Sequence, residues 1–182
     1  MRAAALPGGA EFFASWLRAA DDHAHSTAPP EPALLRDYKP KFFSPDDFSA
    51  LEAFTQILIP TDDTPGAREA HCAQYIDFVL QSSAEFAPQT QKQWRDAMAA
   101  LNAAGFHAAD LKGREALVEA MSKPERDRTA THPLYAVYRL IKQQNTFAFY
   151  TSRAGMIETL EYKGNSYNET FPACNHPEHH TV

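Results

Sequence analysis

The sequence predicts an all-α fold, a single helical domain of about five or six helices with an N-terminal helical arm and an irregular C-terminal tail. Apolar residues recur at helical spacing in successive segments between residues 42 and 151. Pro-marked turns separate these segments, and alternating strand patterns are nearly absent. The chain has 182 residues, 44% of them hydrophobic, and is therefore long enough to bury one core.

Three parts are predicted along the chain: a helical arm with a Pro-rich connector (1–41), a helical core (42–151) and an extended tail (152–182). In the arm, Phe12, Phe13 and Trp16 form one apolar stripe on a short helix. Three prolines within residues 29–32 make the connector extended and semi-rigid. The aromatic stripe of the arm must then be covered by the core or by a partner.

The first core helix has the clearest start and stop signals. Ser44 is the predicted N-cap, Pro45 suits the first helical position, and Asp47 completes an approximate capping box. Pro60 stops the helix, because the residue before a proline disfavours helical backbone. The predicted buried face is Phe48, Leu51, Phe54, Thr55 and Leu58.

Four further helices follow in the predicted core. In the turn before the second helix, Asp62 or Thr64 is the predicted cap and Asp63 supplies a turn hydrogen bond. The second helix turns Cys72, Tyr75, Ile76, Val79 and Leu80 inward. The others span about Pro88–Ala104, about Gly113–Ser122, and from after Pro133 to about Tyr150.

Composition excludes several functions. The net charge is −6, with 17 basic and 23 acidic residues, and there is no basic stripe for nucleic acid. No Gly-rich phosphate loop occurs, so no cofactor site is expected in this chain. No apolar run is long enough to span a membrane, and no signal peptide or twin-arginine pair is visible at the start.

The tail carries the densest group of potential metal ligands, and His23 and His25 offer two more imidazoles near the start of the chain. His176, Glu178, His179 and His180 lie within five residues, and imidazoles are common ligands of transition metals. Pro177 works against a regular helix there, so no metal site is predicted; the alternative is a polar terminus that makes surface or partner hydrogen bonds.

The two cysteines leave alternatives open. Cys72 is most simply a small buried hydrophobe on an apolar helix face. A disulfide with Cys174 remains an alternative in an oxidising compartment. Cys174 has His176 two residues further on, but no nucleophile, base and orienting group stand in an arrangement that indicates catalysis.

Five segments together resemble the gluconate 2-dehydrogenase subunit 3 family. The most specific is the run Ile59-Pro-Thr-Asp-Asp-Thr-Pro-Gly-Ala-Arg-Glu-Ala70, and Tyr162-Lys-Gly-Asn165 supports it independently. The other segments are Phe42-Phe43, Tyr75-Ile76-Asp77, and Phe171 to His179 with its ending Cys-Asn-His-Pro-Glu-His. The resemblance extends from about Phe42 to His179, which is most of the chain.

The resemblance implies a non-catalytic small subunit of a heteromeric dehydrogenase. Such a subunit binds, stabilises and helps mature a large FAD-dependent subunit of the glucose–methanol–choline (GMC) oxidoreductase type. The large subunit oxidises a sugar, sugar acid or glycoside, and a cytochrome c commonly accepts the electrons. FAD is therefore expected in the partner, and the complex in the periplasm, with this chain exported together with its partner.

Aromatic residues in the arm and tail are the predicted partner interface, because large aromatics are the usual anchors of interfaces. The predicted residues are Phe12, Phe13, Trp16, Tyr162, Asn165, Tyr167, Phe171, His176 and His179. The alternative for any one aromatic is burial in this chain's own core. Two other hypotheses are a stand-alone metal-binding or redox protein that uses His176, His179 and Cys174, and a tail that shapes substrate access to the partner's active site.

Overall fold

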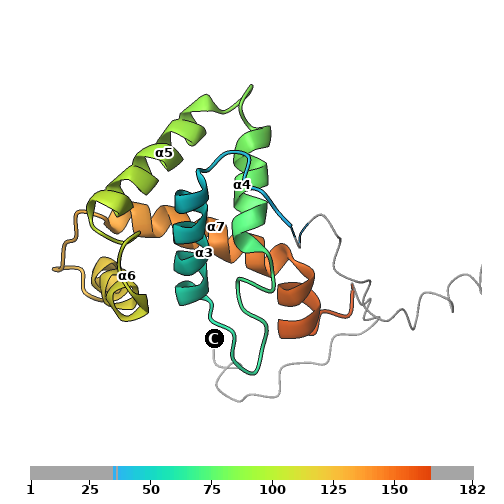
Figure 1. Cartoon of the computed structure of the whole chain (residues 1–182). Coiled ribbons are helices and arrows are strands. Elements are labelled where there is room, and N and C mark those ends of the chain that lie inside the picture. Colours follow the sequence, from blue (N-terminus) through green and yellow to red (C-terminus); the bar gives the residue numbers. More distant parts are fainter. Residues whose placement is uncertain (1–34, 36, 165–182) are drawn as a thin grey trace, which may run out of the picture. The chain divides into compact units, whose positions relative to one another are not determined.

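The computed structural model describes residue 35 and residues 37–164 (Figure 1). The chain divides into two units, Met1–Tyr38 and Lys39–Val182, and all the helices named below belong to the second. They are α3 (Pro45–Leu58), α4 (Cys72–Ser82), α5 (Pro88–Ala103), α6 (Leu111–Arg126), α7 (Tyr135–Thr151) and the π-helix η1 (Ala154–Thr159). The described residues contain no strand, which confirms the all-α prediction.

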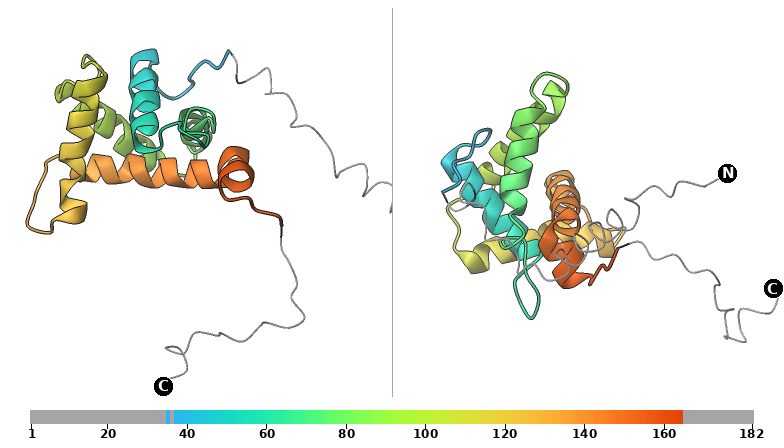
Figure 2. Two further views of the ribbon diagram at one scale, coloured as in Figure 1. Left: turned by 90° about the horizontal axis from the view of Figure 1, so that it is seen from below. Right: turned by 90° about the vertical axis from the view of Figure 1, so that its right-hand side faces the viewer.

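Helix α7 organises the domain, because every other helix named above packs on it. It crosses behind α3 and α4 in Figure 1, and η1 continues directly from its C-terminal end (Figure 2). Its buried residues recur along one side at helical spacing. They are Tyr138, Ile141, Asn145, Ala148 and Phe149.

The core is rich in large apolar side chains. Phe54 of α3, Trp94 of α5 and Phe106 after α5 are each at most 1% exposed. The rings of Phe54 and Phe106 lie 5.4 Å apart, within the range of favourable aromatic pairs. Burial of each such side chain contributes about 1.5–3 kcal/mol, so this core is the main source of the domain's stability.

Helix α3 begins as the sequence predicts. The Ser44 hydroxyl accepts a hydrogen bond from the Asp47 amide at 3.2 Å and donates one to the Asp47 carboxylate at 2.7 Å. Pro45 occupies the first helical turn. Four of the five residues of the predicted buried face are buried and Leu58 is half-buried.

The predicted cap of α4 is wrong. Asp62 instead accepts hydrogen bonds from the amide and hydroxyl of Thr64, which closes a local turn and lowers the pKa of this carboxyl. Helix α4 begins ten residues later, after His71, which has left-handed backbone (φ 54°) and caps with no side-chain hydrogen bond. A whole loop separates Asp62 from the helix, so its side chain cannot reach the free amides of α4.

Two other elements differ from the prediction. Helix α6 is longer than Gly113–Ser122, because Asp110 caps it by accepting from the Gly113 amide at 2.8 Å. It also runs through Pro124, which cannot donate the usual backbone hydrogen bond to residue 120, and it ends two residues later at Arg126. Within the tail predicted to be irregular, Ala154–Thr159 form the π-helix η1. π-helices are rare and lack a simple sequence period, so the pattern did not indicate it.

Candidate partner interface

A group of large apolar side chains on α4 and α7 is exposed to solvent. Phe78 is 56% exposed and Phe147 is 54% exposed, with Tyr150, Tyr75 and Val79 between 37% and 43%. Tyr75 of α4 and Phe147 of α7 contact each other, with ring centroids 6.3 Å apart. The other members lie three or four residues along the same helices and are therefore neighbours. These five residues are termed the aromatic face.

The aromatic face lies in a part of the chain that has almost no charge. Asp77 is the only charged residue of α4, and none occurs in α7 from Gln143 to Thr151. In the whole chain, by contrast, 22% of residues are charged. Interface cores are depleted of charge and enriched in aromatic residues. The composition of this face is therefore that of a protein-binding surface rather than of an ordinary solvated one.

The one charge of α4 points inward. Asp77 is fully buried, and its carboxylate accepts hydrogen bonds from three consecutive amides, those of Lys41 (2.7 Å), Phe42 (3.0 Å) and Phe43 (2.9 Å). Such charge-assisted bonds satisfy a buried carboxylate that would otherwise be very costly. They fix α4 to the segment that leads into α3.

A second buried polar group joins three helices behind the aromatic face. Asn145 of α7 donates to the Thr55 carbonyl of α3 at 3.1 Å, and the Cys72 thiol of α4 contacts the Asn145 carbonyl at 3.9 Å. All three residues are at most 1% exposed. Burial raises the pKa of Cys72 to about 12, so the thiol stays neutral and is no nucleophile.

The structure bears on one of the two cysteines, Cys72. Cys72 is a free, buried thiol, which supports its interpretation as a small hydrophobe. Cys174 lies outside the described residues, so the alternative of a disulfide with Cys174 is not tested.

The loop between α3 and α4 is tied down by its own side chains. The Glu69 carboxylate accepts from the Thr61 hydroxyl at 2.6 Å and from the Gly66 amide at 3.0 Å, and the first of these bonds chiefly lowers its pKa. A side chain at Gly66 would place its Cβ 2.6 Å from the Thr61 amide nitrogen. The residues of this motif therefore hold the loop's shape, and none of them is arranged as an acid–base pair.

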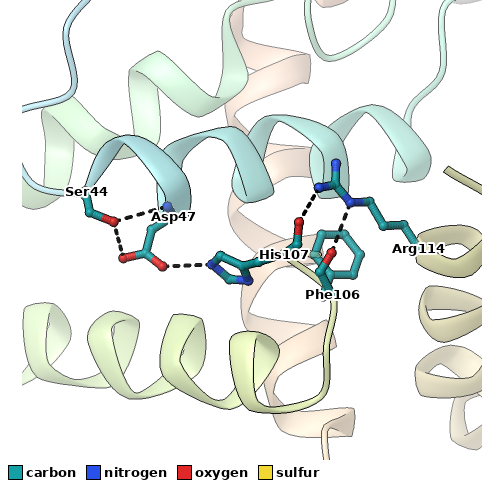
Figure 3. A network of polar contacts seen from close by, with 5 residues as sticks. All are labelled: Ser44, Asp47, Phe106, His107 and Arg114. Atoms are coloured by element: carbon teal, nitrogen blue, oxygen red, sulfur yellow. Dashed lines mark hydrogen bonds and ion pairs between the residues drawn. The ribbon is translucent and has the colours of Figure 1, made fainter. Parts of the chain in front are cut away.

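A polar cluster at the start of α3 resembles a catalytic arrangement only superficially (Figure 3). The Asp47 carboxylate lies between the Ser44 hydroxyl (2.7 Å) and Nε2 of His107 (2.9 Å). A nucleophilic serine needs the imidazole, not the carboxylate, as its direct partner. Arg114 donates to the backbone carbonyls of Phe106 and His107, so the cluster joins the α5–α6 turn to neighbouring helices. It is a structural feature.

Of the predicted interface residues, only Tyr162 falls within the described part. It is 44% exposed, and with Ile157 (45%) and Leu160 (57%) it adds apolar surface at and after η1. Its amide donates to the Met156 carbonyl at 2.9 Å. The other predictions lie outside the described residues: Phe12, Phe13, Trp16, Asn165, Tyr167, Phe171, His176 and His179.

The sequence interpretation missed the aromatic face. Tyr75 and Val79 were predicted to point inward because they share an apolar stripe with Ile76, whereas the structure exposes both by more than a third. Phe78 and Phe147 fell outside the predicted interface. Two features of the sequence could have identified them. The two helical segments have almost no charged residues, and their apolar residues cover more of the helix circumference than contact with a core requires.

Residues 37–164 offer neither a metal site nor a membrane span. No group of three or more His, Cys, Asp or Glu in this part of the chain is placed to hold a metal ion. Likewise, none of its helices has the length and apolar character needed to cross a membrane. The feature that stands out in the described domain is an uncharged aromatic surface on a helical scaffold.

An exposed, uncharged aromatic surface on a helical domain is typical of proteins that bind another chain. A sequence model named gluconate 2-dehydrogenase subunit 3 matches residues 45–168 of this chain. The chain therefore belongs to the gluconate 2-dehydrogenase subunit 3 family, and its resemblance to that family is confirmed. Family membership identifies it as a subunit of a dehydrogenase complex. No curated protein and no solved structure matches it significantly.

Proposed function

We propose that this chain is the non-catalytic small subunit of a dehydrogenase complex, and that it binds, stabilises and helps mature a large FAD-dependent subunit of the GMC type. The observation that carries the proposal is the aromatic face: five exposed apolar residues on two helical segments that have no exposed charge. The large subunit oxidises a sugar, sugar acid or glycoside in the periplasm and passes electrons to a cytochrome c.

The physical basis is the free energy of covering that face. Burying a large apolar side chain contributes about 1.5–3 kcal/mol, and a few aromatic anchors usually supply most of the affinity of an interface. Within the aromatic face, Phe78 and Phe147 are each more than half exposed and therefore have the largest fraction of their surface left to bury. A partner that covers them gains affinity and protects its own apolar surface, which is how a small subunit stabilises a larger one.

The same geometry supports a non-catalytic role. In the described residues the only thiol is buried and neutral, and the one Ser–Asp–His cluster has the wrong order for a nucleophile. In this proposal FAD is bound by the partner, where the oxidation of substrate takes place.

Co-expression tests the proposal. The large subunit is produced with the wild-type chain, with no small subunit, and with two variants of the chain. Phe147→Asp places a carboxylate in the aromatic face, whereas Leu111→Asp makes a comparable change at a 65% exposed leucine at the start of α6. An acidic residue is favourable at a helix N-terminus, so the Leu111 variant should fold and bind normally.

The expected result is loss of soluble, FAD-loaded large subunit when the small subunit is omitted or carries Phe147→Asp, with normal yield for Leu111→Asp. FAD absorbance, gluconate or glycoside oxidation and cytochrome c reduction are measured on each preparation. A large subunit that folds, loads FAD and turns over equally well alone would overturn the proposal.

A further inference from the structure

A groove opens beside the aromatic face where α4, α5 and α7 meet. Its volume is about 480 Å³, and its apolar lining comes from Ile76, Val79 and Leu80 of α4, Trp94 of α5 and Leu140 of α7. That volume is within the range of sites that accept a compact ligand or several side chains of a partner. The groove is termed the α4–α5 groove.

The α4–α5 groove is held in shape by hydrogen bonds. The side-chain amide of Gln91 donates to the Leu80 carbonyl at 2.7 Å, and the Ser83 hydroxyl donates to the same carbonyl at 2.9 Å. The Ala87 amide donates to the Ser83 carbonyl at 2.8 Å, which closes the corner between the two helices. Because Trp94 is only 1% exposed, the floor is part of the packed core and the groove does not need to form on binding.

No charged side chain lines the groove. Its polar residues are neutral: Ser83, Thr90, Gln93, Gln143 and Gln144. The nearby Asp77 carboxylate is occupied by three backbone amides on another side of α4. An ion in the groove would lose its hydration without gaining an opposite charge, so the groove favours an uncharged, mainly apolar occupant.

The α4–α5 groove is continuous with the aromatic face, because Val79 belongs to both. At the corner beyond Ser83, Phe86 is 78% exposed and extends the apolar surface. A protein that covers the aromatic face therefore reaches the mouth of the groove. A small molecule bound there would leave Phe78 and Phe147 uncovered.

We propose that the α4–α5 groove receives a large apolar side chain from an uncharged segment of the large subunit, as the central anchor of the interface. This inference rests on the proposed function and adds the location and chemistry of the contact. Interface hot spots are typically large side chains that fill desolvated pockets and are surrounded by contacts that exclude water, and the aromatic face would supply such surrounding contacts here. The neutral amides of Gln143 and Gln144 are then available to the backbone of the bound segment.

Two variants test the groove without touching the packed core. Gln144→Glu introduces charge at nearly constant size, and Gln143→Trp fills the groove from an exposed position. Glu115→Trp, on the exposed surface of α6, is the matched control for the added tryptophan. Each full-length variant is checked for unchanged thermal unfolding, and its dissociation constant for the purified large subunit is measured by biolayer interferometry.

We expect both groove variants to weaken binding by about tenfold or more, and Glu115→Trp to bind within about twofold of wild type. Binding of both groove variants within about twofold of wild type would overturn the inference while leaving the proposed function intact. Stoichiometric uptake of the uncharged apolar dye Nile red in the groove, with subunit binding unaffected, would also overturn it. Failure of the wild-type chain to bind at all would instead count against the proposed function.

Discussion

Helices α4 and α6 both pack on α7, yet their exposed surfaces are built from different residues. In α6, seven of 16 residues are charged, and Glu125 pairs with Lys142 of α7 at 2.5 Å. In α4, one residue of 11 is charged, and that residue is buried. Both helices stabilise the same core, so folding alone does not explain the difference. The contrast is the one expected from the proposal above, in which α6 faces water whereas α4 and the C-terminal half of α7 face another chain.

The largest effect should follow from removing the buried charge of α4. Asp77→Ala leaves three backbone amides of residues 41–43 without their acceptor, and we expect it to lower the free energy of unfolding by about 3–5 kcal/mol. Glu119→Ala, at an exposed carboxylate of α6, should change it by less than about 0.5 kcal/mol. Urea unfolding of both variants measures the difference.

A second variant, Asp77→Asn, allows the comparison if Asp77→Ala does not fold. Asp77→Asn keeps the size of the side chain and one acceptor oxygen, so it should lose less stability than the alanine variant. Equal stability of the Asp77 and Glu119 variants would contradict the assignment of Asp77 as the anchor of α4.

A pair of glycines gives the next contrast. A Cβ at Gly155 of η1 would lie 2.1 Å from the Phe149 carbonyl oxygen, so Gly155→Ala should cost about 1–3 kcal/mol through a forced backbone shift. At Gly113 of α6 the nearest atom is the capping Asp110 carboxylate at 3.0 Å, which needs to shift by only a few tenths of an ångström, and alanine is the better helix former. Gly113→Ala should therefore stay within about 1 kcal/mol of wild type. Thermal unfolding distinguishes the two, and equal effects would contradict close packing at η1.

A smaller, pH-dependent effect on the free energy of unfolding is expected from the ion pair between Glu125 of α6 and Lys142 of α7. The hydrogen bond from Lys142 holds the pKa of Glu125 below its ordinary value of 4.5. The folded state then binds fewer protons than the unfolded state, so Glu125 stabilises the fold above that value and loses its contribution as pH falls through the folded pKa. Because both side chains are partly exposed, the contribution is under about 1 kcal/mol.

Glu125→Gln measures this contribution. The wild type should be slightly more stable than the variant at pH 7, and the two should converge in urea unfolding as the pH falls below the lowered pKa of Glu125. Glu115→Gln, at an exposed carboxylate elsewhere on α6, provides the control. A difference that grew on acidification would contradict the assigned sign.

The smallest expected effect is that of salt on the affinity for the large subunit. An interface through the uncharged aromatic face should depend little on ionic strength, so the dissociation constant for the large subunit should change by less than about threefold between roughly 50 and 500 mM NaCl. Titration at the two salt concentrations measures it. A tenfold loss of affinity would show that the charged surface, and not the aromatic face, makes the contact.

The family resemblance gains a physical explanation from the contacts. The segments Phe42-Phe43 and Tyr75-Ile76-Asp77 are distant in sequence, with Phe43 and Asp77 separated by 34 positions, and they meet because Asp77 accepts hydrogen bonds from both phenylalanine amides. The motif from Ile59 to Ala70 holds a loop closed through Glu69 and Gly66. Most of these motif residues keep the scaffold in shape, whereas Tyr75 also belongs to the aromatic face, the proposed partner-binding surface on α4 and α7.

Local patterns determined which segments of this protein are helical. The cap at Ser44, the glycine with positive φ at Gly105 after α5, and the apolar periods of α3 and α5 act within a few residues, so they can be recognised in the sequence. The family resemblance was also present in the sequence, because it depends on residue order.

The tertiary structure decided which apolar stripes are covered. Tyr75, Phe78 and Phe147 have the same residue types as a core stripe, and only the positions of α3, α5 and η1 around α4 and α7 leave them exposed. The pairing of Asp77 with residues 41–43 and the opening of the α4–α5 groove also join segments that are distant in sequence. Periodicity indicates that a helix has an apolar side, whereas exposure depends on which other helices reach that side.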